Sequence, residues 1–369
     1  MTAFVKSLLL LLLASSVSGQ TLAHWVRPVN APVITPNPVS VFSDPVTNTQ
    51  VHWEALHTFN PAAVVRDGRV VVLYRAEDDS GENAIGMHVS RLGMATSDDG
   101  IHFTRLPEPV FFAAKDAQFS REVPGGVEDP RVVEAPDGTY VLTYTQWSRK
   151  RSAYSIGIAT SSDLMHWKKH GPAFGDTGKY AEYHYKSAGI VTQRTGNKLV
   201  AARVNGRFWM YWGENPVRLA SSSDLIHWKP VEDAAGRPVV LLANRDGEPE
   251  SAFPETGPPP VLTSDGIVVL YNAKNSDDPK ISDAKLAAGA YSVERAVFDA
   301  HEPAHLLSRT TTPVFQPELA FERSGQYAAG TTFAEGLVWF HNAWWLYYGC
   351  ADSFVGVAVS RAEEDSDNR

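Results

Sequence analysis

The feature that most constrains the fold of this chain is a sequence motif that recurs five times, at intervals of about 61 to 71 residues. Three copies share the pattern Ser-x-Asp-x-x-x-Trp/Phe after a short apolar run, and two copies keep only the apolar run and its Ser. In order, the copies occupy residues 93–103, 157–167, 218–228, 289–292 and 356–360. Self-similarity at a fixed long period is typical of repeat architectures. The chain is therefore expected to consist of five similar units.

A second element precedes each copy of the motif. It is a run of β-branched and aromatic residues, introduced in most units by a turn dipeptide such as Asp67-Gly68 or Asp137-Gly138. These runs occupy residues 70–75, 140–145, 208–212, 267–272 and 344–348. A tight turn between two such strands predicts a hairpin. Units of this length are too long for a solenoid repeat and suit four-stranded propeller blades.

We therefore predict an all-β fold, a five-bladed β-propeller with four-stranded antiparallel blades that occupies residues 20–360 as a single domain. No long amphipathic helix is evident in the sequence. The Ser-x-Asp pair of the motif is expected to close a turn, and its aromatic residue is expected to pack between blades. The motif is thus expected to be structural and not catalytic.

The two ends of the chain differ in character from the repeats. The segment Met1–Gly19 has Lys6 near its start, an apolar stretch too short to span a membrane, and small residues before Gln20. This pattern predicts a secretory signal peptide. The protein is therefore expected to be exported, periplasmic or secreted, without membrane insertion once the signal is removed. Residues 361–369 are mostly charged and predict a disordered acidic tail.

Composition and isolated motifs exclude several classes of function. A net charge of −9 argues against a nucleic-acid partner. The single Cys350 excludes an internal disulfide and any cysteine-rich metal site. The segment His301–His305 matches the zinc-protease pattern, but Pro303 would break the helix that this pattern needs. Neither a metal site nor a cofactor is expected, and segments 80–88 and 277–286 could form pocket walls or meet a neighbour in a homo-oligomer.

Acidic residues beside stiff turns, outside the repeat motif, are the candidate catalytic groups. Asp129, next to Glu128, lies between two glycines and a proline. Glu214 follows an aromatic strand, and Glu255 lies in the Pro/Gly-rich segment 253–260. A carboxylate held by a rigid backbone suits general acid and base catalysis. Each also has a plain structural interpretation, as a turn with an ion pair, an exposed turn residue or a rigid connector, but their occurrence in three different units favours one shared site.

Other polar residues recur near the predicted strand ends and are candidate substrate contacts. Each of them, taken alone, is more typical of a surface residue or an ion pair. Together they could line a sugar pocket, in which arginine and carboxylate groups bind hydroxyls. They are Asn60, Arg75, Arg91, Arg131, Lys186 and Asp352.

Several of these segments resemble glycoside hydrolase family 130. They are Val127–Arg131, Asn60-Pro61, Leu73–Arg75, Gly257–Pro260 and Tyr347–Asp352, and the resemblance extends from about residue 60 to residue 360. It implies a five-bladed β-propeller that acts on β-mannosides with inversion, either as a phosphorylase or as a hydrolase. It also implies that Asp129 is the acid and works through a sugar hydroxyl.

The chain departs from the phosphorylase pattern of this family at two places. Where the phosphorylases carry basic residues for phosphate, this sequence has Glu214 after the third-unit strand and Asn272 between Tyr271 and Ala273. A glutamate would repel a phosphate dianion, whereas a water nucleophile needs a carboxylate base. The resemblance to the hydrolase members places their pair of glutamates on Glu214 and Glu255. Asn272 marks the lost phosphate ligand and is expected to face the pocket.

The expected function is that of an exported inverting glycoside hydrolase that releases mannose from β-1,2- or β-1,4-linked manno-oligosaccharides. Three alternatives stay open. A β-mannoside phosphorylase would use inorganic phosphate and give mannose 1-phosphate. An arabinanase-like glycosidase would need a catalytic Asp early in the first unit, where Glu77, Asp78 and Asp79 are the nearby acids. A non-catalytic sugar-binding propeller would be unaffected when Asp129 is changed to Asn.

Overall fold

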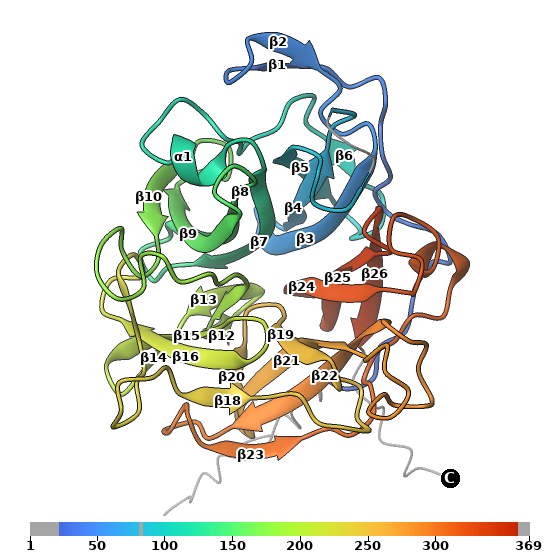
Figure 1. Cartoon of the computed structure of the whole chain (residues 1–369). Coiled ribbons are helices and arrows are strands. Elements are labelled where there is room, and N and C mark those ends of the chain that lie inside the picture. Colours follow the sequence, from blue (N-terminus) through green and yellow to red (C-terminus); the bar gives the residue numbers. More distant parts are fainter. Residues whose placement is uncertain (1–21, 81–83, 361–369) are drawn as a thin grey trace, which may run out of the picture.

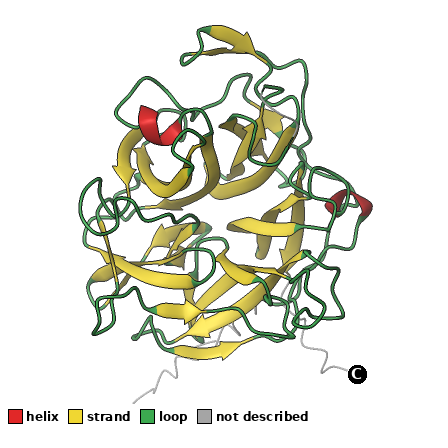
Figure 2. Cartoon of the chain, in the orientation of Figure 1, coloured by secondary structure: helices red, strands yellow, loops and turns green. Residues whose placement is uncertain are grey.

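The computed structural model describes residues 22–80 and 84–360, which form sheets arranged around a common centre (Figure 1). Among these residues, helix is confined to α1 (Phe119–Glu122) and the 3-10 turn η1 (Ala320–Glu322), as Figure 2 shows. Neither is long and apolar enough to cross a membrane. The predicted signal peptide, residues 1–19, and the predicted tail, residues 361–369, lie outside the described residues. The all-β prediction is confirmed.

Blades 1 and 2 each consist of four antiparallel strands in chain order. Blade 1 contains β3 (His57–Arg66), β4 (Arg69–Glu77), β5 (Ser90–Ser97) and β6 (Thr104–Arg105). Blade 2 contains β7 (Gly126–Glu134), β8 (Tyr140–Ser148), β9 (Ala153–Ser161) and β10 (Lys168–Pro172). The turn Asp67-Gly68 joins β3 to β4 with φ of 51° and 76°, the left-handed backbone that a two-residue hairpin turn requires.

Blades 3 and 4 follow the same plan with additional short strands. Blade 3 contains β11 (Ala188–Ile190), β14 (Arg203–Val204), β15 (Arg207–Trp212), β16 (Val217–Ser222), β17 (Trp228–Pro230) and β18 (Val240–Leu242). Blade 4 contains β19 (Phe253–Thr256), β20 (Val261–Thr263), β21 (Gly266–Lys274), β22 (Tyr291–Phe298) and β23 (Leu306–Arg309). The hairpin β12 (Thr192–Thr195) and β13 (Lys198–Ala201) links blades 2 and 4, because β13 pairs with β7 and β12 pairs with β20.

Blade 5 is closed by the other end of the chain. Its own strands are β24 (Thr332–Phe340), β25 (Ala343–Cys350) and β26 (Phe354–Ser360). The N-terminal segment runs antiparallel along β26, with bridges from Val26 to Val359 and from Ile34 to Val355. The four strands predicted for this blade are therefore three from its own unit and one N-terminal segment, which ties the two ends of the propeller together. The hairpin β1 (Phe42–Asp44) and β2 (Thr49–Val51) lies outside the blades (Figure 1).

Five apolar clusters lie between consecutive blades and hold the ring together. Because side chains alternate across each strand, a blade packed on both sides buries both of its faces. From blade 1 onward, each cluster contains residues of two neighbouring blades, such as Leu73 and Leu142, Ile158 and Met210, Leu219 and Val269, Leu270 and Leu346, and Val357 and Val72. The fifth cluster joins blade 5 back to blade 1, so the sheets form a closed circle and the inner strands face a central channel.

The recurring motif is structural, as predicted. In the first copy, Ser97 Oγ accepts a hydrogen bond from the backbone N–H of Gly100 at 2.9 Å and donates one to Asp99 Oδ1 at 2.9 Å. The second and third copies repeat this arrangement at Ser161 and Ser222. The aromatic residue Phe103 packs edge-on against Tyr347 of blade 5, with ring centroids 5.8 Å apart. The zinc-protease match, residues 301–305, lies between β22 and β23 in a turn and not on a helix, as expected.

Candidate active site

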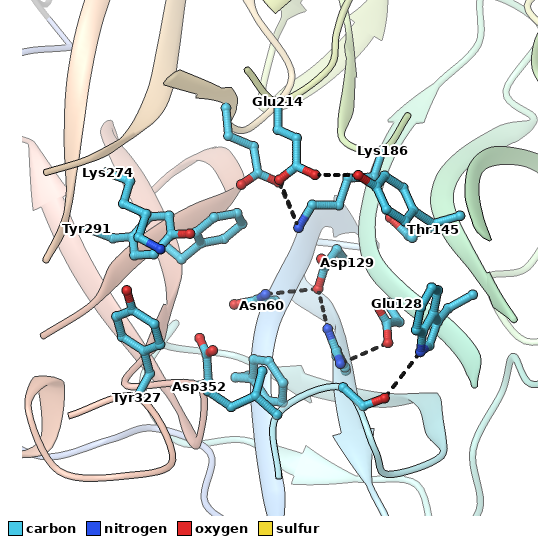
Figure 3. A pocket seen from close by; sticks show the side chains of 18 residues that line it. Asn60, Glu128, Asp129, Thr145, Lys186, Glu214, Lys274, Tyr291, Tyr327 and Asp352 are labelled. Atoms are coloured by element: carbon cyan, nitrogen blue, oxygen red, sulfur yellow. Dashed lines mark hydrogen bonds and ion pairs between the residues drawn. The ribbon is translucent and has the colours of Figure 1, made fainter. Parts of the chain in front are cut away.

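A cavity of about 380 Å³ lies where the inner strands of the five blades converge (Figure 3). It is the size of a small-molecule site and is lined by groups from all five blades. Seven of the ten predicted site residues line it, namely Asn60, Arg75, Asp129, Lys186, Glu214, Glu255 and Asp352. The structure thus brings together the acids that the sequence places in three different units.

Two bulged inner strands direct Asn60 and Asp129 into the cavity. The register of β3 shifts between Phe59 and Pro61, and that of β7 shifts between Glu128 and Arg131. At each bulge the backbone is left-handed, with φ of 46° at Asn60 and 48° at Asp129. Asn and Asp tolerate this conformation better than other side chains, and such strain is typical of functional positions. Asn60 Nδ2 donates a hydrogen bond to Asp129 Oδ1 at 2.9 Å, so the two bulges support each other.

Arg75 is the centre of an acidic cluster on the floor of the cavity. Its guanidinium lies 2.6 Å from Glu77, 2.9 Å from Glu128 and 3.1 Å from Asp129. Burial works against ionisation of Asp129, but Arg75 and Lys186 outweigh it and lower the pKa of Asp129 to about 2. Burial and the neighbouring Asp129 raise the pKa of Glu128 to about 7, although Arg75 opposes this. The two adjacent carboxyls therefore differ in role: Asp129 is ionised and Glu128 can carry a proton near neutral pH.

Glu214 and Glu255 lie side by side because their backbones pair across blades 3 and 4. An antiparallel bridge joins the two residues, flanked by hydrogen bonds from Asn215 N–H to Pro254 and from Thr256 N–H to Gly213. A pair flanked in this way brings its side chains closest together. Gly213 makes the turn possible, since its φ is 105° and a Cβ there would lie 2.8 Å from the Pro216 carbonyl oxygen.

Lys186 bridges the two glutamates. Its Nζ lies 3.4 Å from Glu214 Oε2 and 3.3 Å from Glu255 Oε1 (Figure 3). Burial would lower the pKa of Lys186, but Glu255 and Glu214 outweigh it and hold that pKa well above its usual value. Burial raises the pKa of Glu255, and Lys186 opposes this rise. The ammonium of Lys186 therefore keeps a buried glutamate available as a base.

Further hydrogen bonds hold this pair. The Tyr154 hydroxyl donates to Glu214 Oε1 at 3.1 Å, and Ser187 Oγ donates to Glu255. Burial and the nearby Glu214 raise the pKa of Tyr154 to about 12, so the phenol stays a donor at neutral pH.

The opposite wall combines aromatic rings with Lys274 and Asp352. Lys274 Nζ lies 5.5 Å from the ring centroids of Phe253 and Tyr291 and 5.7 Å from that of Tyr327. Burial raises the pKa of Asp352 to about 7, although Arg75 opposes the rise. This wall therefore offers rings against which an apolar sugar face can pack, beside a carboxyl that can hold a proton.

Eleven of the eighteen lining residues are not among the predicted site residues, and four of these eleven are Glu128, Tyr154, Tyr291 and Tyr327. Glu128 was noted in the sequence only as the neighbour of Asp129, and Tyr154 and Tyr327 have no motif around them. Tyr291 did carry a signal, because it occupies the motif position where the other four copies have Ala. At that motif position, blade 4 places a ring in the cavity wall.

Three predicted contact residues lie outside the cavity wall. Arg91, on the third strand of blade 1, is held by Asp44 and Asp78. Arg131 extends behind the site, where it donates to the backbone carbonyls of Thr256 and Gly257 and pairs with Glu335 at 3.1 Å. Asn272 was expected to face the pocket, which is wrong. Its side-chain amide donates to the Ala334 carbonyl at 3.1 Å and accepts from the Ala334 N–H at 2.8 Å, so it bridges blades 4 and 5.

A polar cavity over a propeller channel, with two sets of carboxyls and aromatic walls, is typical of carbohydrate-active enzymes that use acid–base chemistry. A family model described as beta-1,4-mannooligosaccharide phosphorylase matches residues 29–365. The chain therefore belongs to glycoside hydrolase family 130, which contains mannoside phosphorylases and some hydrolases that act on β-1,2 mannosyl linkages. The resemblance and the five-bladed fold are confirmed.

Relatives of both reaction types are similar to this chain. A 1,2-beta-oligomannan phosphorylase from a Thermoanaerobacter species is 30% identical, over 83% of this chain and 90% of the relative. A structure of a putative glycoside hydrolase from Parabacteroides distasonis is 50% identical, with a TM-score of 0.89 over 92% of this chain and 97% of that chain. A further structure is 45% identical, with a TM-score of 0.90 over 93% of this chain and 95% of that chain. It is described as "The GH130 family of mannoside phosphorylases contains glycoside hydrolases that target beta-1,2 mannosidic linkages in Candida mannan".

Proposed function

We propose that this protein is an exported, inverting β-mannosidase that hydrolyses β-1,2-linked manno-oligosaccharides and releases mannose. The observation that carries the proposal is the pair Glu214 and Glu255, bridged by Lys186 in the cavity wall. A water molecule beside this pair would find a carboxylate to accept its proton, which hydrolysis requires and phosphorolysis does not.

The charges of the cavity also favour water over phosphate. The lining contains the five carboxyl groups of Glu128, Asp129, Glu214, Glu255 and Asp352, and the three cations of Arg75, Lys186 and Lys274. Two of these cations are already paired, Arg75 with Glu128 and Asp129, and Lys186 with the two glutamates. With Glu128 and Asp352 protonated, the three remaining carboxylates balance the three cations, so a phosphate dianion entering here would find no surplus of positive charge. Its charge would also lie near the carboxylates, and unit charges of like sign about 4 Å apart repel by about 4 kcal/mol near a protein surface.

In this reaction the glutamate pair removes a proton from water as the water attacks the anomeric carbon. The glycosidic bond breaks on the opposite face of the sugar, so the product forms with inverted configuration. Glu255 is the more buried of the pair, with a side chain 1% exposed against 22% for Glu214. We assign Glu255 as the base and Glu214 as its partner in orienting the water.

The leaving oxygen needs a proton, and Asp129 is ionised in the free protein. Glu128 and Asp352, whose pKa values are each about 7, are the carboxyls that hold a proton at working pH. Asp129 then orients a sugar hydroxyl, which passes its proton to the glycosidic oxygen and is reprotonated from this cluster. This assignment keeps the hydroxyl relay expected for Asp129 but moves the stored proton to its neighbours.

The linkage and the export rest on different grounds. The β-1,2 linkage is supported by the relatives, because two phosphorylases and the 45%-identical structure are described with that linkage. Export is supported by the signal-like segment Met1–Gly19. Cell fractionation of the native host, with an antibody to the protein, tests export directly.

The deciding experiment is product analysis on β-1,2-mannobiose and its longer homologues, with and without inorganic phosphate. Free mannose released at equal rates in both conditions is the expected result, and NMR during the first turnovers should show the α-anomer. Glu302→Gln is the control for Glu255→Gln, because it changes an exposed acid in the turn between β22 and β23 that does not line the cavity. Mannose 1-phosphate formed only with phosphate would overturn the hydrolase assignment.

The second candidate is a β-mannoside phosphorylase, and one observation favours it. Among the residues that the structure describes, Lys274 is the lining cation that forms no ion pair, and it could hold an anion. Lys274→Met separates the two functions, since a phosphorylase would lose affinity for phosphate whereas a hydrolase has none to lose.

A further inference from the structure

We propose that His57, Glu77 and His88 form a binding site for a divalent transition-metal ion, with zinc as the preferred metal, at the cavity end of blade 1. One nitrogen of each imidazole and one carboxylate oxygen lie within 4.8 Å of one another. Two imidazoles and a carboxylate are a recurring zinc-ligand set in proteins. None of the three residues has a step in the proposed reaction, although Glu77 shares Arg75 with Glu128 and Asp129, and the site does not depend on that reaction.

The fold brings these residues together from three separate places in blade 1. His57 begins β3, Glu77 ends β4, and His88 lies two residues before β5. His57 is paired directly with Glu77 in the register of β3 and β4. The two imidazole centroids are 5.9 Å apart. Two of the three ligands thus lie on paired strand ends, as a preorganised metal site needs, and the third lies in the segment that leads into β5.

Both imidazoles are oriented in the way that metal-bound histidines usually are. His88 Nδ1 lies 2.8 Å from the Ser80 carbonyl oxygen, and His57 Nδ1 lies 2.9 Å from Ser353 Oγ. A metal-bound histidine commonly donates its second ring N–H to a carbonyl or another oxygen, which fixes the tautomer and leaves the other nitrogen for the metal. In both residues that other nitrogen is Nε2.

The clearest sign of a missing ligand is His88 Nε2. The His88 side chain is 2% exposed, and its Nε2 is buried without a hydrogen-bond partner in the part of the chain that the structure describes. With Nδ1–H donating to a carbonyl, Nε2 keeps its lone pair and is the ring nitrogen left for a metal shared with Glu77 and His57. A buried unsatisfied acceptor destabilises the folded protein, and a metal ion bound to it would remove that cost.

Charge and space also suit a divalent cation. Around Arg75 stand Glu77, Glu128 and Asp129, so the floor of the cavity carries excess negative charge. Arg75 binds Oε1 of Glu77, whereas Oε2 accepts only a 3.2 Å hydrogen bond from Gln326 and can turn to a metal. Ligand atoms of a tetrahedral zinc lie roughly 3.4 Å apart, so the three atoms, which are within 4.8 Å of one another, must approach by up to about 1.4 Å, which side-chain rotations can supply.

A metal here would act on the cavity wall. His88 follows Ile85 and Gly86, which line the cavity, and the Gly86 carbonyl accepts a hydrogen bond from Trp147 Nε1 at 3.2 Å. Bonding His88 to the strand ends of β3 and β4 would fix this segment against blade 2. The site is therefore a structural clip beside the cavity and not a generator of the nucleophile.

The test uses the untagged protein after dialysis against a chelator, because a histidine tag would bind the same metals. Zinc is added in competition with a chromophoric chelator, and bound metal is counted by mass spectrometry. We expect one zinc per chain, and a rise in the melting temperature with zinc but not with magnesium. Cobalt should bind the same site and give visible absorption bands typical of tetrahedral nitrogen and oxygen ligation.

His57→Ala and His88→Ala, singly and together, should abolish stoichiometric zinc binding and the cobalt bands. His305→Ala is the matched control, because it removes an exposed histidine from the segment that matches a zinc motif. It should bind zinc as the unchanged protein does. Absence of stoichiometric zinc binding by the unchanged protein would overturn the proposal, even if the histidine variants failed to fold. Unchanged binding in the folded double variant would also overturn it.

Discussion

Replacing Lys186 by methionine tests whether a single ammonium sets the pKa of the catalytic base. The Lys186 Nζ is 3.3 Å from Glu255 and 3.4 Å from Glu214. Methionine keeps most of the volume but removes the charge, which leaves two facing carboxylates without their cation. We expect the base to hold its proton more tightly, so that higher pH is needed to ionise it.

The magnitude follows from the geometry. At an effective dielectric constant of about 20, two unit charges 3.3 Å apart attract by roughly 5 kcal/mol. The Lys186 side chain is 26% exposed, and solvent screening of this kind reduces the figure to roughly 2–3 kcal/mol. Since 1.36 kcal/mol corresponds to one pKa unit, the pKa of Glu255 should rise by about 2.

The assay is the dependence of kcat/KM on pH between 4 and 9, with β-1,2-mannobiose as substrate. A base must be deprotonated to act, so the rate rises with pH through its pKa. In the Lys186→Met variant this acidic limb should move about 2 pH units toward alkaline values. Lys186→Arg keeps the cation and should move the limb by much less.

Lys274→Met is the matched control, because its ammonium lies over aromatic rings on the opposite wall. It should leave the acidic limb in place. If Lys186→Met lowers kcat/KM by the same factor at every pH, Lys186 contacts the substrate instead of tuning the base, and the reasoning is refuted.

Four further results are expected. Glu255→Gln should lower kcat by about 10² to 10⁴ with little change in substrate affinity, measured by steady-state kinetics and by binding calorimetry. Because Glu128 and Asp352 must be protonated, kcat/KM should fall above an apparent pKa of about 7, and a rate that stays flat to pH 9 would exclude this cluster as the acid. Since the pKa of Asp352 is raised, its contribution to stability is lost as pH rises from about 4 through 7. The free energy of unfolding of Asp352→Asn, relative to that of the unchanged protein, should therefore be greater at pH 8 than at pH 5 by on the order of 2 kcal/mol, measured by denaturant unfolding. A second cavity of about 300 Å³ shares Tyr154 and Glu214 with the first and is also lined by Tyr183, so Tyr183→Ala should lower kcat/KM on mannotetraose but not on mannobiose.

The fold was predictable because each blade repeats the same local sequence pattern of strands and turns. A turn motif that satisfies its own backbone donors, as at Ser97 and Asp99, is visible in one stretch of sequence. The closure of blade 5 was not predictable in this way, because the segment around Val26 carries no repeat and pairs with β26 over nearly the whole chain length. Local patterns predict blades, whereas the partner of the last strand depends on how the ring closes.

The same distinction separates the site residues that were predicted correctly from those that were not. Glu214 and Glu255 stand out in the sequence because rigid turns flank them, and the structure places them together. The predictions that Arg91 and Asn272 face the cavity were wrong, because a position near a strand end does not determine the direction of the side chain. Arg91 lies on the third strand of its blade, away from the channel, and Asn272 turns toward the backbone of the neighbouring blade. Direction depends on register and bulges, which a single sequence does not display.

The same bulges explain why an acidic cavity can exist at all. Left-handed backbone at Asn60 and Asp129 is unfavourable, and so is a buried carboxylate, yet the two are linked by one hydrogen bond and neutralised by Arg75. Arg75 in the floor and Lys186 in the wall are thereby occupied by carboxylates. An arrangement that uses Arg75 and Lys186 in this way leaves Lys274 as the lining cation for an incoming anion, and a single ammonium is a weak counterpart for a phosphate dianion. The arrangement that, in our proposal, makes a base of Glu255 would therefore also disfavour phosphate as the nucleophile.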